Sequence, residues 1–182
     1  MRQVDLGRYS ESWYKPGGIA KRAVWHIVNL LFFKSSIPYP NILKVSLLKM
    51  FGAEVGAGAN IKPNVNIKYP WFIDIGKNVW IGEAVWIDNK AKVTIGNNVC
   101  ISQSAYIMTS NHDYKKEAFD LIIKPIIIED GVWVGARSVI CPGVTLKSHS
   151  VVTAGSVIAK DAEPYGIYKG VPAELVRPRV IE

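Results

Sequence analysis

The sequence predicts an all-β solenoid: a parallel β-helix of about five triangular coils, with a short N-terminal α-helical cap and one protruding loop. Three observations lead to this fold. An aliphatic residue recurs every six positions, a small or branched residue stands two positions before each, and the interruptions fall at one point of a three-unit cycle. The recurring positions are Val55, Ile61, Ile67, Ile75, Ile81, Ile87, Ile95, Ile101, Ile107, Ile128, Val134, Ile140, Leu146, Val152 and Ile158.

A period of six fits neither a continuous helix, which needs apolar residues three to four apart, nor a long alternating strand. It fits a short strand with two inward residues, followed by a corner and repeated. Three such sides close a triangular coil, with neighbouring rungs about 4.8 Å apart. Each coil can bury its aliphatic residues only against the coils above and below, so the coils must stack.

The interruptions of the six-residue period indicate where the functional site lies. Steps of eight separate Ile67 from Ile75 and Ile87 from Ile95, and a step of twenty-one separates Ile107 from Ile128. All three insertions follow the third side of a coil, so they are expected along one edge of the prism, with a loop over 108–125. Insertions into a solenoid gather on its binding face, and we expect the functional site there.

Three regions are expected along the chain. Residues 1–51 form an arm and two helices, over 19–33 and 42–50, which cap the open end of the first coil. Their basic and aromatic residues, including Trp25, Phe32 and Phe33, also suit contact with a membrane surface, and this alternative stays open. Residues 52–162 form the β-helix, and residues 163–182 form a tail that folds back over the last coil.

Composition narrows the classes of partner. The net charge of +7 favours an anionic partner such as a phosphorylated small molecule, although a solvated basic face explains it equally well. No nucleic-acid-binding motif or Lys/Arg run is present. No apolar run has the length of a signal peptide core or a membrane span, and Cys100 and Cys141 are expected as reduced thiols. These features predict a cytoplasmic protein.

His112 is the candidate for acid–base chemistry because it lies in the long loop, within Ser110-Asn111-His112-Asp113-Tyr114. A loop histidine without a role is the alternative, and His26 and His149 are expected to be structural or solvated. The histidines are too scattered for a zinc site, so no metal is expected. Asp88 and Asn89, on the same edge, can hydrogen-bond a polyhydroxylated ligand. Trp71, Phe72 and Trp86 offer aromatic faces for a sugar ring, whereas Trp80 and Trp86 suit packing in a subunit interface equally well.

The segment Ile128–Asp161, the tail element GVPAELVR and the NHDY loop together resemble the hexapeptide-repeat acyltransferases with a left-handed β-helix. The likeness is greatest to exopolysaccharide acetyltransferases of the colanic-acid type, and broader to maltose, galactoside and nodulation-factor O-acetyltransferases. It implies a left-handed helix, acetyl-CoA as co-substrate without a metal, and a homotrimer with active sites between subunits.

The resemblance also implies roles for individual residues. His112 matches the general base, while Gly82 stands where simple-sugar members carry an acceptor-binding asparagine, so the acceptor site departs from theirs. The positions implied for acetyl-CoA are Trp133, Gly135, Ala136, Ala154, Lys160 and Arg177. Those expected at the acceptor are Asp88, Asn89, Asn111 and Asp113.

The resulting expectation is an acetyl-CoA-dependent O-acetyltransferase. Its acceptor would be a sugar hydroxyl of a surface polysaccharide or its precursor, modified in the cytoplasm or at the inner face of the cell membrane. Two alternatives stay open: N-acetylation of an amino sugar or antibiotic-like acceptor by the same machinery, and a non-catalytic β-helix scaffold.

Overall fold

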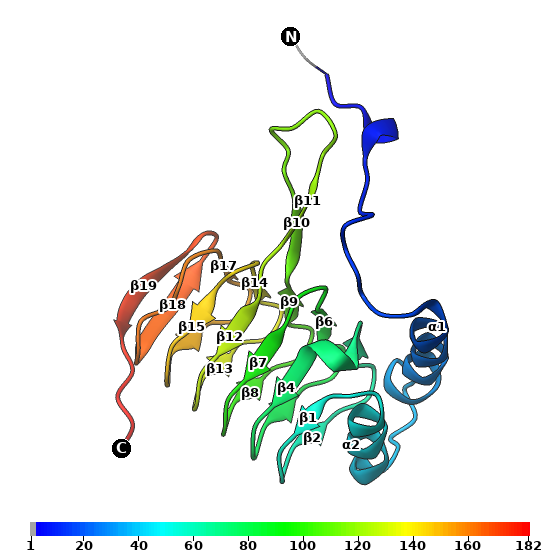
Figure 1. The fold of residues 1–182 in the computed structure, drawn as a ribbon. Coiled ribbons are helices and arrows are strands. Elements are labelled where there is room, and N and C mark those ends of the chain that lie inside the picture. The colour runs from blue at the N-terminus through cyan, green and yellow to red at the C-terminus, as the bar shows by residue number, and fades with distance from the viewer. Residues whose placement is uncertain (1–2) are drawn as a thin grey trace.

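The computed structural model describes residues 3–182 and shows a parallel β-helix whose three faces are sheets (Figure 1). Sheet A contains β1 (Glu54–Val55), β4 (Ile73–Ile75), β7 (Val93–Ile95), β12 (Ile126–Ile128) and β15 (Thr145–Leu146). Sheet B contains β2 (Asn60–Ile61), β5 (Trp80–Ile81), β8 (Cys100–Ile101), β13 (Trp133–Val134) and β16 (Val151–Val152), followed by β18 (Gly166–Gly170) and β19 (Ala173–Pro178). Sheet C contains β3 (Asn66–Ile67), β6 (Trp86–Asp88), β9 (Tyr106–Met108), β14 (Val139–Ile140) and β17 (Val157–Ile158).

The aliphatic positions of the repeat form the core. On sheet B, for example, Ile61 pairs with Ile81, Ile81 with Ile101, and Ile101 with Val134, each at the same depth. None of these four side chains is more than 3% exposed. Successive coils therefore stack their inward residues into columns, and the predicted β-helix is confirmed.

The predicted number of coils was slightly too low. Beyond the five complete coils, Ala162 forms a parallel bridge to Leu146, and β18 pairs in parallel with β16. These contacts add part of a sixth turn. The chain then reverses, and β19 pairs antiparallel with β18. The sequence pattern missed this turn because Ala162 follows Ile158 by four residues instead of six, although Ala162 and Tyr168 continue the stack.

The three insertions lie on one edge, as predicted, because each connects a strand of sheet C to the next strand of sheet A. The first contains the 3₁₀-helix η3 (Pro70–Phe72), and the second covers residues 89–92. The third is a projecting antiparallel hairpin, β10 (Ser110–His112) and β11 (Leu121–Ile123), where the sequence indicated only a loop (Figure 1). We call this edge the insertion edge.

Helices α1 (Ile19–Val28) and α2 (Asn41–Met50) lie at the open end of the first coil, and α1 continues into a π-helical segment, η2 (Asn29–Phe33). Trp25, Phe33 and Leu48 of these helices are buried and belong to the same core as the β-helix. No helix within residues 3–182 is long and apolar enough to cross a membrane.

Side chains of these helices replace the missing strand partners of the first coil. Asn41 accepts a hydrogen bond from the Ile61 N–H at 2.8 Å and donates another to the Ala59 carbonyl oxygen. Trp25 Nε1 donates to the Ile67 carbonyl oxygen at 2.9 Å. Backbone groups at an uncovered sheet end would otherwise lack partners when buried.

Lys44 contributes to the same end through its Nζ, which donates to the carbonyl oxygens of Ile61 at 3.2 Å and Lys62 at 3.0 Å. The residue is fully buried. Burial, together with the nearby charge of Lys62, lowers the pKa of the Lys44 ammonium group below its usual value. An ammonium group thus serves here as a backbone cap.

Replacing Asn41 by alanine is expected to destabilise the fold, because Asn41→Ala leaves the Ile61 N–H and the Ala59 carbonyl without partners. The expected loss in the free energy of unfolding is about 1–3 kcal/mol, measured as a lower midpoint of urea denaturation. Ser46→Ala, an exposed position of the same helix, is the matched control and should leave the midpoint unchanged. Equal midpoints for the two variants would show that Asn41 does not stabilise the first coil.

Candidate functional site

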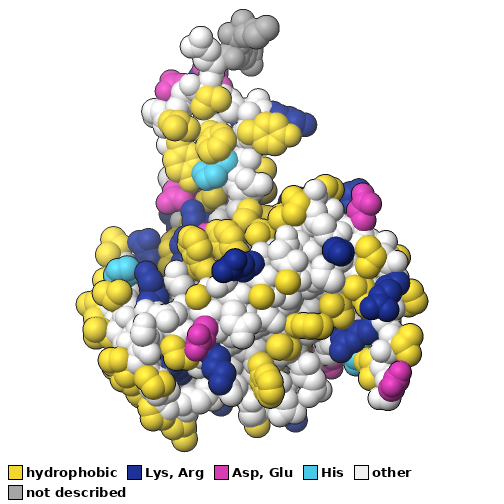
Figure 2. Space-filling model, turned by 180° about the vertical axis from the view of Figure 1, so that it is seen from behind, with side chains coloured by type: hydrophobic (Ala, Val, Ile, Leu, Met, Phe, Trp, Pro, Cys, Tyr) yellow, Lys and Arg dark blue, Asp and Glu magenta, His cyan; other side chains and the backbone are white. Residues whose placement is uncertain are grey.

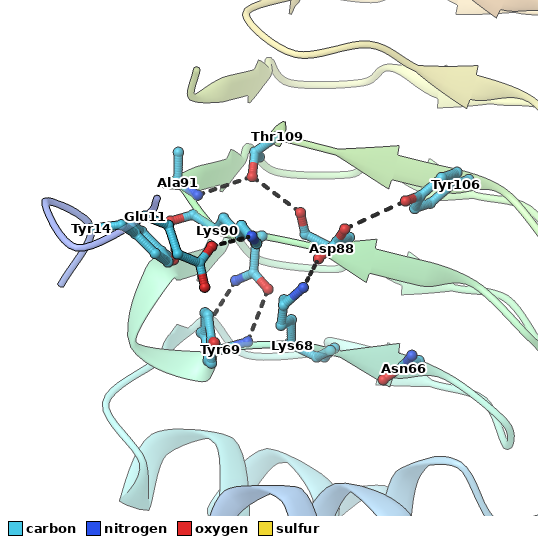
Figure 3. A network of polar contacts seen from close by, with 12 residues as sticks. Glu11, Tyr14, Asn66, Lys68, Tyr69, Asp88, Lys90, Ala91, Tyr106 and Thr109 are labelled. Atoms are coloured by element: carbon cyan, nitrogen blue, oxygen red, sulfur yellow. Dashed lines mark hydrogen bonds and ion pairs between the residues drawn. The ribbon is translucent and has the colours of Figure 1, made fainter. Parts of the chain in front are cut away.

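A polar network occupies the insertion edge at the end of β6 (Figure 3). Asp88 is 8% exposed and forms an ion pair with Lys68 at 2.7 Å. The Tyr106 hydroxyl donates to Asp88 Oδ2 at 3.4 Å, and the Thr109 hydroxyl donates to the Asp88 carbonyl oxygen at 3.1 Å. Burial raises the pKa of Tyr106, and the charge of Asp88 raises it further. Asp88 therefore fixes the root of the projecting hairpin.

Asn89, which follows Asp88 and is also expected at the acceptor, is fully buried. Its Oδ1 accepts the Tyr69 N–H at 3.0 Å, and its Nδ2 donates to the Tyr69 carbonyl oxygen at 2.6 Å. Both functional groups of the amide therefore join successive coils at the corner. The register placed Asn89 on the expected edge, but its side chain is turned into the protein and bonds to the Tyr69 backbone.

His112 ends strand β10 on the projecting hairpin. Its Nδ1 lies 2.9 Å from the Phe119 carbonyl oxygen, and its ring stacks on the Phe119 ring with centroids 4.4 Å apart and an angle of 7°. Because a carbonyl oxygen can only accept, Nδ1 carries the hydrogen and the neutral ring keeps its lone pair on Nε2. The imidazole is thus fixed in place with one nitrogen free to accept a proton.

The two neighbours of His112 make local bonds. The Asn111 Oδ1 accepts the His112 N–H at 2.8 Å, and the Asp113 Oδ1 accepts the Lys115 N–H at 3.1 Å. Asn111 is exposed and Asp113 is partly exposed, so both retain polar atoms at the surface of the hairpin. Both residues lie next to His112 on the exposed hairpin.

The N-terminal arm, residues 3–17, lies against the hairpin, a contact that no local sequence pattern indicates. The Asp5 N–H donates to the Glu117 carbonyl oxygen at 2.9 Å, and Arg8 forms an ion pair with the Glu117 side chain at 2.9 Å. The Tyr9 ring centroid lies 5.5 Å from that of His112. His112 is therefore in contact with Phe119 and Tyr9, and hydrophobic side chains surround a histidine on the projection (Figure 2).

The arm is also tied to the insertion edge. Glu11 accepts a hydrogen bond from the Tyr9 hydroxyl at 3.1 Å and forms an ion pair with Lys90 at 3.2 Å. The Tyr14 hydroxyl donates to the Lys90 carbonyl oxygen at 2.7 Å (Figure 3). The hydrogen bond from Lys90 lowers the pKa of Glu11, and burial raises the pKa of Tyr14. Tyr9 thus belongs to a connected set of contacts that runs from His112 to the second coil.

Trp133 faces outward from sheet B, between Cys100 and Val151 of the neighbouring coils, and is 46% exposed. Its Nε1 donates to the Ser102 hydroxyl at 2.9 Å, which fixes the indole while its surface stays accessible. Gly135 follows at the corner toward sheet C. A Cβ there would lie 2.5 Å from the Ala154 nitrogen, so only glycine permits this approach of the two coils.

Ala136 and Ala154 occupy equivalent positions at the corner between sheets B and C, in the fourth and fifth coils. Among residues 3–182, no acceptor receives a hydrogen bond from either N–H. The same position holds Glu83 in the second coil and Gln103 in the third, with longer side chains. The alanines therefore combine small side chains with backbone N–H groups that have no partner in the described residues, which suits a ligand with amide carbonyl groups such as a pantetheine arm.

The two basic residues expected to bind acetyl-CoA, Lys160 and Arg177, do not lie at the corner between sheets B and C. Lys160 is exposed on the insertion edge, between β17 and the Ala162 bridge, and Arg177 is exposed on β19. His112 also extends from the insertion edge, whereas Trp133, Ala136 and Ala154 lie on or beside sheet B. A single chain therefore does not bring all the expected site residues into one pocket.

The remaining candidates have structural contacts. Trp71 Nε1 donates to the Pro16 carbonyl oxygen at 3.0 Å, with Lys21 Nζ 4.4 Å from the ring centroid, and Phe72 packs edge-on against Trp71. His149 stacks on Tyr165 with centroids 4.9 Å apart.

Cys100 and Cys141 are free thiols. In the described part of the chain, no three His, Cys, Asp or Glu residues cluster as metal ligands would. Trp80 is 63% exposed on the same column of sheet B as Trp133.

Comparison with known proteins agrees with this architecture. The family model "Hexapeptide repeat of succinyl-transferase" matches residues 125–160. A protein of Escherichia coli K12 named "Putative colanic acid biosynthesis acetyltransferase WcaF" is 32% identical over 180 residues, which cover 97% of both chains. The galactoside O-acetyltransferase of the same organism is 34% identical over 148 residues, 80% of this chain and 73% of that one.

A solved structure shows the same fold. A hexapeptide-repeat acetyltransferase of Vibrio cholerae O1 biovar eltor, determined in complex with acetyl coenzyme A, superimposes with a TM-score of 0.79 at 31% identity. The match covers 89% of this chain and 88% of that one. With the similarity to the Escherichia coli protein extending over nearly the whole of both sequences, the chain belongs to the hexapeptide-repeat acetyltransferases.

Proposed function

We propose that this protein is an acetyl-CoA-dependent O-acetyltransferase acting on a sugar hydroxyl of a surface polysaccharide or its precursor, with His112 as general base. The observation that carries the proposal is the fixed imidazole: Nδ1 is bonded to the Phe119 carbonyl oxygen, which leaves Nε2 free to accept a proton. The names of the relatives support the substrate class, since one is a galactoside O-acetyltransferase and another is assigned to colanic acid biosynthesis.

In this mechanism His112 Nε2 accepts the proton of the acceptor hydroxyl as the oxygen attacks the acetyl carbon. Acetyl-CoA supplies the acetyl group as a reactive thioester. His112 then returns the proton to the sulfur that leaves, so the histidine finishes the cycle in its starting state. Phe119 and Tyr9 keep the ring in one orientation, and this preorganisation lowers the entropic cost of the reaction.

The donor is assigned to the corner between sheets B and C. The exposed indole of Trp133 would line the pantetheine arm, Gly135 permits the close approach of the coils there, and the uncovered amides of Ala136 and Ala154 would bind its carbonyl groups. Lys160 and Arg177 would contact the phosphates of CoA. These residues fit an elongated ligand that contains amides at one end and phosphates at the other.

The active unit in this proposal is a homotrimer with sites between subunits. The trimer is supported by the positions of the site residues in one chain, where His112 extends from the insertion edge and Trp133 lies on sheet B. A neighbouring copy could present its donor corner to the hairpin of the first. Asp88, Asn111 and Asp113 would then lie on the acceptor side of each site. The reaction is assigned to the cytoplasm, at or near the inner face of the cell membrane.

Substituting His112 tests the base. His112→Ala is expected to lower kcat about 10²- to 10⁴-fold because proton transfer is lost, while the affinity for acetyl-CoA stays unchanged. Release of free CoA thiol gives the rate, and calorimetric titration gives the affinity. His149→Gln is the control, since this histidine packs on Tyr165 away from the hairpin. Turnover by His112→Ala equal to that of the control would contradict the assignment.

The donor corner is tested by adding bulk at equivalent positions of two coils. Ala154→Phe should weaken acetyl-CoA binding at least about tenfold, the equivalent of roughly 1.4 kcal/mol, because the ring covers the amides. Gln103→Phe, at the same corner two coils earlier, should bind acetyl-CoA like the wild type. Similar affinities for both variants would place the donor elsewhere.

Mixing the two kinds of inactive subunit extends this test to the trimer. Co-refolded His112→Ala and Ala154→Phe chains should regain activity, because some interfaces then combine an intact hairpin with an intact donor corner. The two homotrimers mixed without refolding serve as the control. Absence of recovery in verified mixed trimers would mean that each site lies within one subunit.

Tyr9 is tested as a positioning residue. Tyr9→Ala should lower kcat about tenfold, because the His112 ring loses a neighbour and small misplacements are costly, with little change in KM for acetyl-CoA. Tyr9→Phe keeps the ring and should restore most of kcat. If the phenylalanine variant were as slow as the alanine variant, the hydroxyl and its bond to Glu11, rather than ring packing, would be responsible.

A further inference from the structure

A cavity of ≈ 340 Å³ lies between helix α1 and sheet C of the first two coils. Its lining includes the basic residues Arg22, His26, Lys34 and Lys68, and the aromatic residues Tyr69 and Trp86. None of these residues is among those assigned to His112 or to acetyl-CoA. We propose that this cavity binds the phosphate or diphosphate group of the acceptor, an inference that rests on the proposed function.

The charges of the cavity are unbalanced. Its lining contains no Asp or Glu. Lys68 is compensated by Asp88, but within residues 3–182 neither Arg22 nor Lys34 takes part in an ion pair. An anion would therefore meet two uncompensated cations from different segments, α1 and the end of η2.

Arg22 gives the most specific indication. Its Nε is buried and has no hydrogen-bond partner among the described residues. Leaving a charged donor buried and unpaired costs free energy, and an oxyanion placed beside it removes that cost. The planar guanidinium group also suits phosphate oxygens, which it binds through two parallel hydrogen bonds.

Several other side chains of the lining are bonded within the protein and shape the cavity. Trp25 Nε1 donates to the Ile67 carbonyl oxygen at 2.9 Å, and the Asn29 amide donates to Asn66 at 2.7 Å. Trp86 stacks on Tyr106 with centroids 4.6 Å apart and is 44% exposed. The face of Trp86 that Tyr106 leaves uncovered can pack against a sugar ring next to the phosphate.

The position favours the acceptor over the donor. Lys68 and Tyr69 lie on the insertion edge, and Lys68 bonds to the Asp88 side chain while Thr109, at the root of the His112 hairpin, bonds to the Asp88 backbone (Figure 3). Ala136 and Ala154 lie in the fourth and fifth coils, whereas the cavity lies at the first two. The volume accommodates a sugar ring with its phosphate group but not a polymer.

The phosphate could belong to a free sugar nucleotide or sugar phosphate, or to a lipid-linked sugar. The outer face of the helical segment next to the cavity exposes Val24, Ile27 and Leu31, each by more than half. These side chains could contact a lipid chain. The probes must therefore include a diphosphate without a lipid and one with a lipid.

The test is calorimetric titration of the whole protein with inorganic pyrophosphate and with farnesyl diphosphate at constant ionic strength. Both should bind, and Arg22→Gln and Lys34→Gln should each weaken binding at least about fivefold, since charge-assisted hydrogen bonds to phosphate are lost. Lys49→Gln removes the same charge from the exposed end of α2 and is the matched control. Farnesyl diphosphate binding more tightly than pyrophosphate would identify a lipid-linked ligand, and equal affinity a free one.

Three results would overturn the proposal. These are no binding of either probe, equal weakening by the Lys49 control, and displacement of pyrophosphate by acetyl-CoA, which would assign the cavity to the donor. Lys34 is exposed, so its variant keeps the proposal testable if Arg22→Gln fails to fold. Because the readout is binding, it also separates this proposal from the proposed function. A protein that binds pyrophosphate in the cavity but transfers no acetyl group would refute only the latter.

Discussion

The structure depends on one constraint: a coil of this β-helix cannot bury its inward side chains or pair its backbone without a coil on each side. Inside the stack the constraint is met by repetition, with each aliphatic residue lying over the next. At the first coil it has to be met by other means. Trp25, Asn41 and Lys44 supply the hydrogen bonds that a preceding coil would have made. The N-terminal helices thus stabilise the first coil of the β-helix in place of a preceding coil.

Much of the fold could be predicted because the six-residue period follows directly from the way inward residues stack from one coil to the next. The fifteen repeat positions gave the three faces, and the interruptions gave the edge that carries the insertions. The second helix begins at Asn41, one residue before the expected start. The sixth turn could not be seen in the same way. Ala162 and Tyr168 continue the core and the sheet at the usual spacing of six, but Ala162 follows Ile158 by only four residues, and this step breaks the period.

The candidate site was predictable in position and less so in detail. Spacing placed Asp88, Asn89 and the His112 loop on one edge, because a period counts residues along the chain. It could not say which way a side chain turns, and Asn89 is directed onto the Tyr69 backbone. Nor could it reveal contacts between distant segments, such as Arg8 with Glu117. Lys44 did carry a signal, since it lies four residues before Leu48 on the buried side of α2, where a charge is unusual.

The insertion edge also bears on how such a protein can diversify. Length can be added between sheet C and sheet A without shifting the register of any strand, because the connections there leave the stack and return to it. Under the proposed function, a lineage could therefore exchange loops around the acceptor while the donor corner, made of glycine and alanine on the opposite side of sheet C, stays unchanged. New substrate preferences would then arise by insertion and deletion rather than by rebuilding the core.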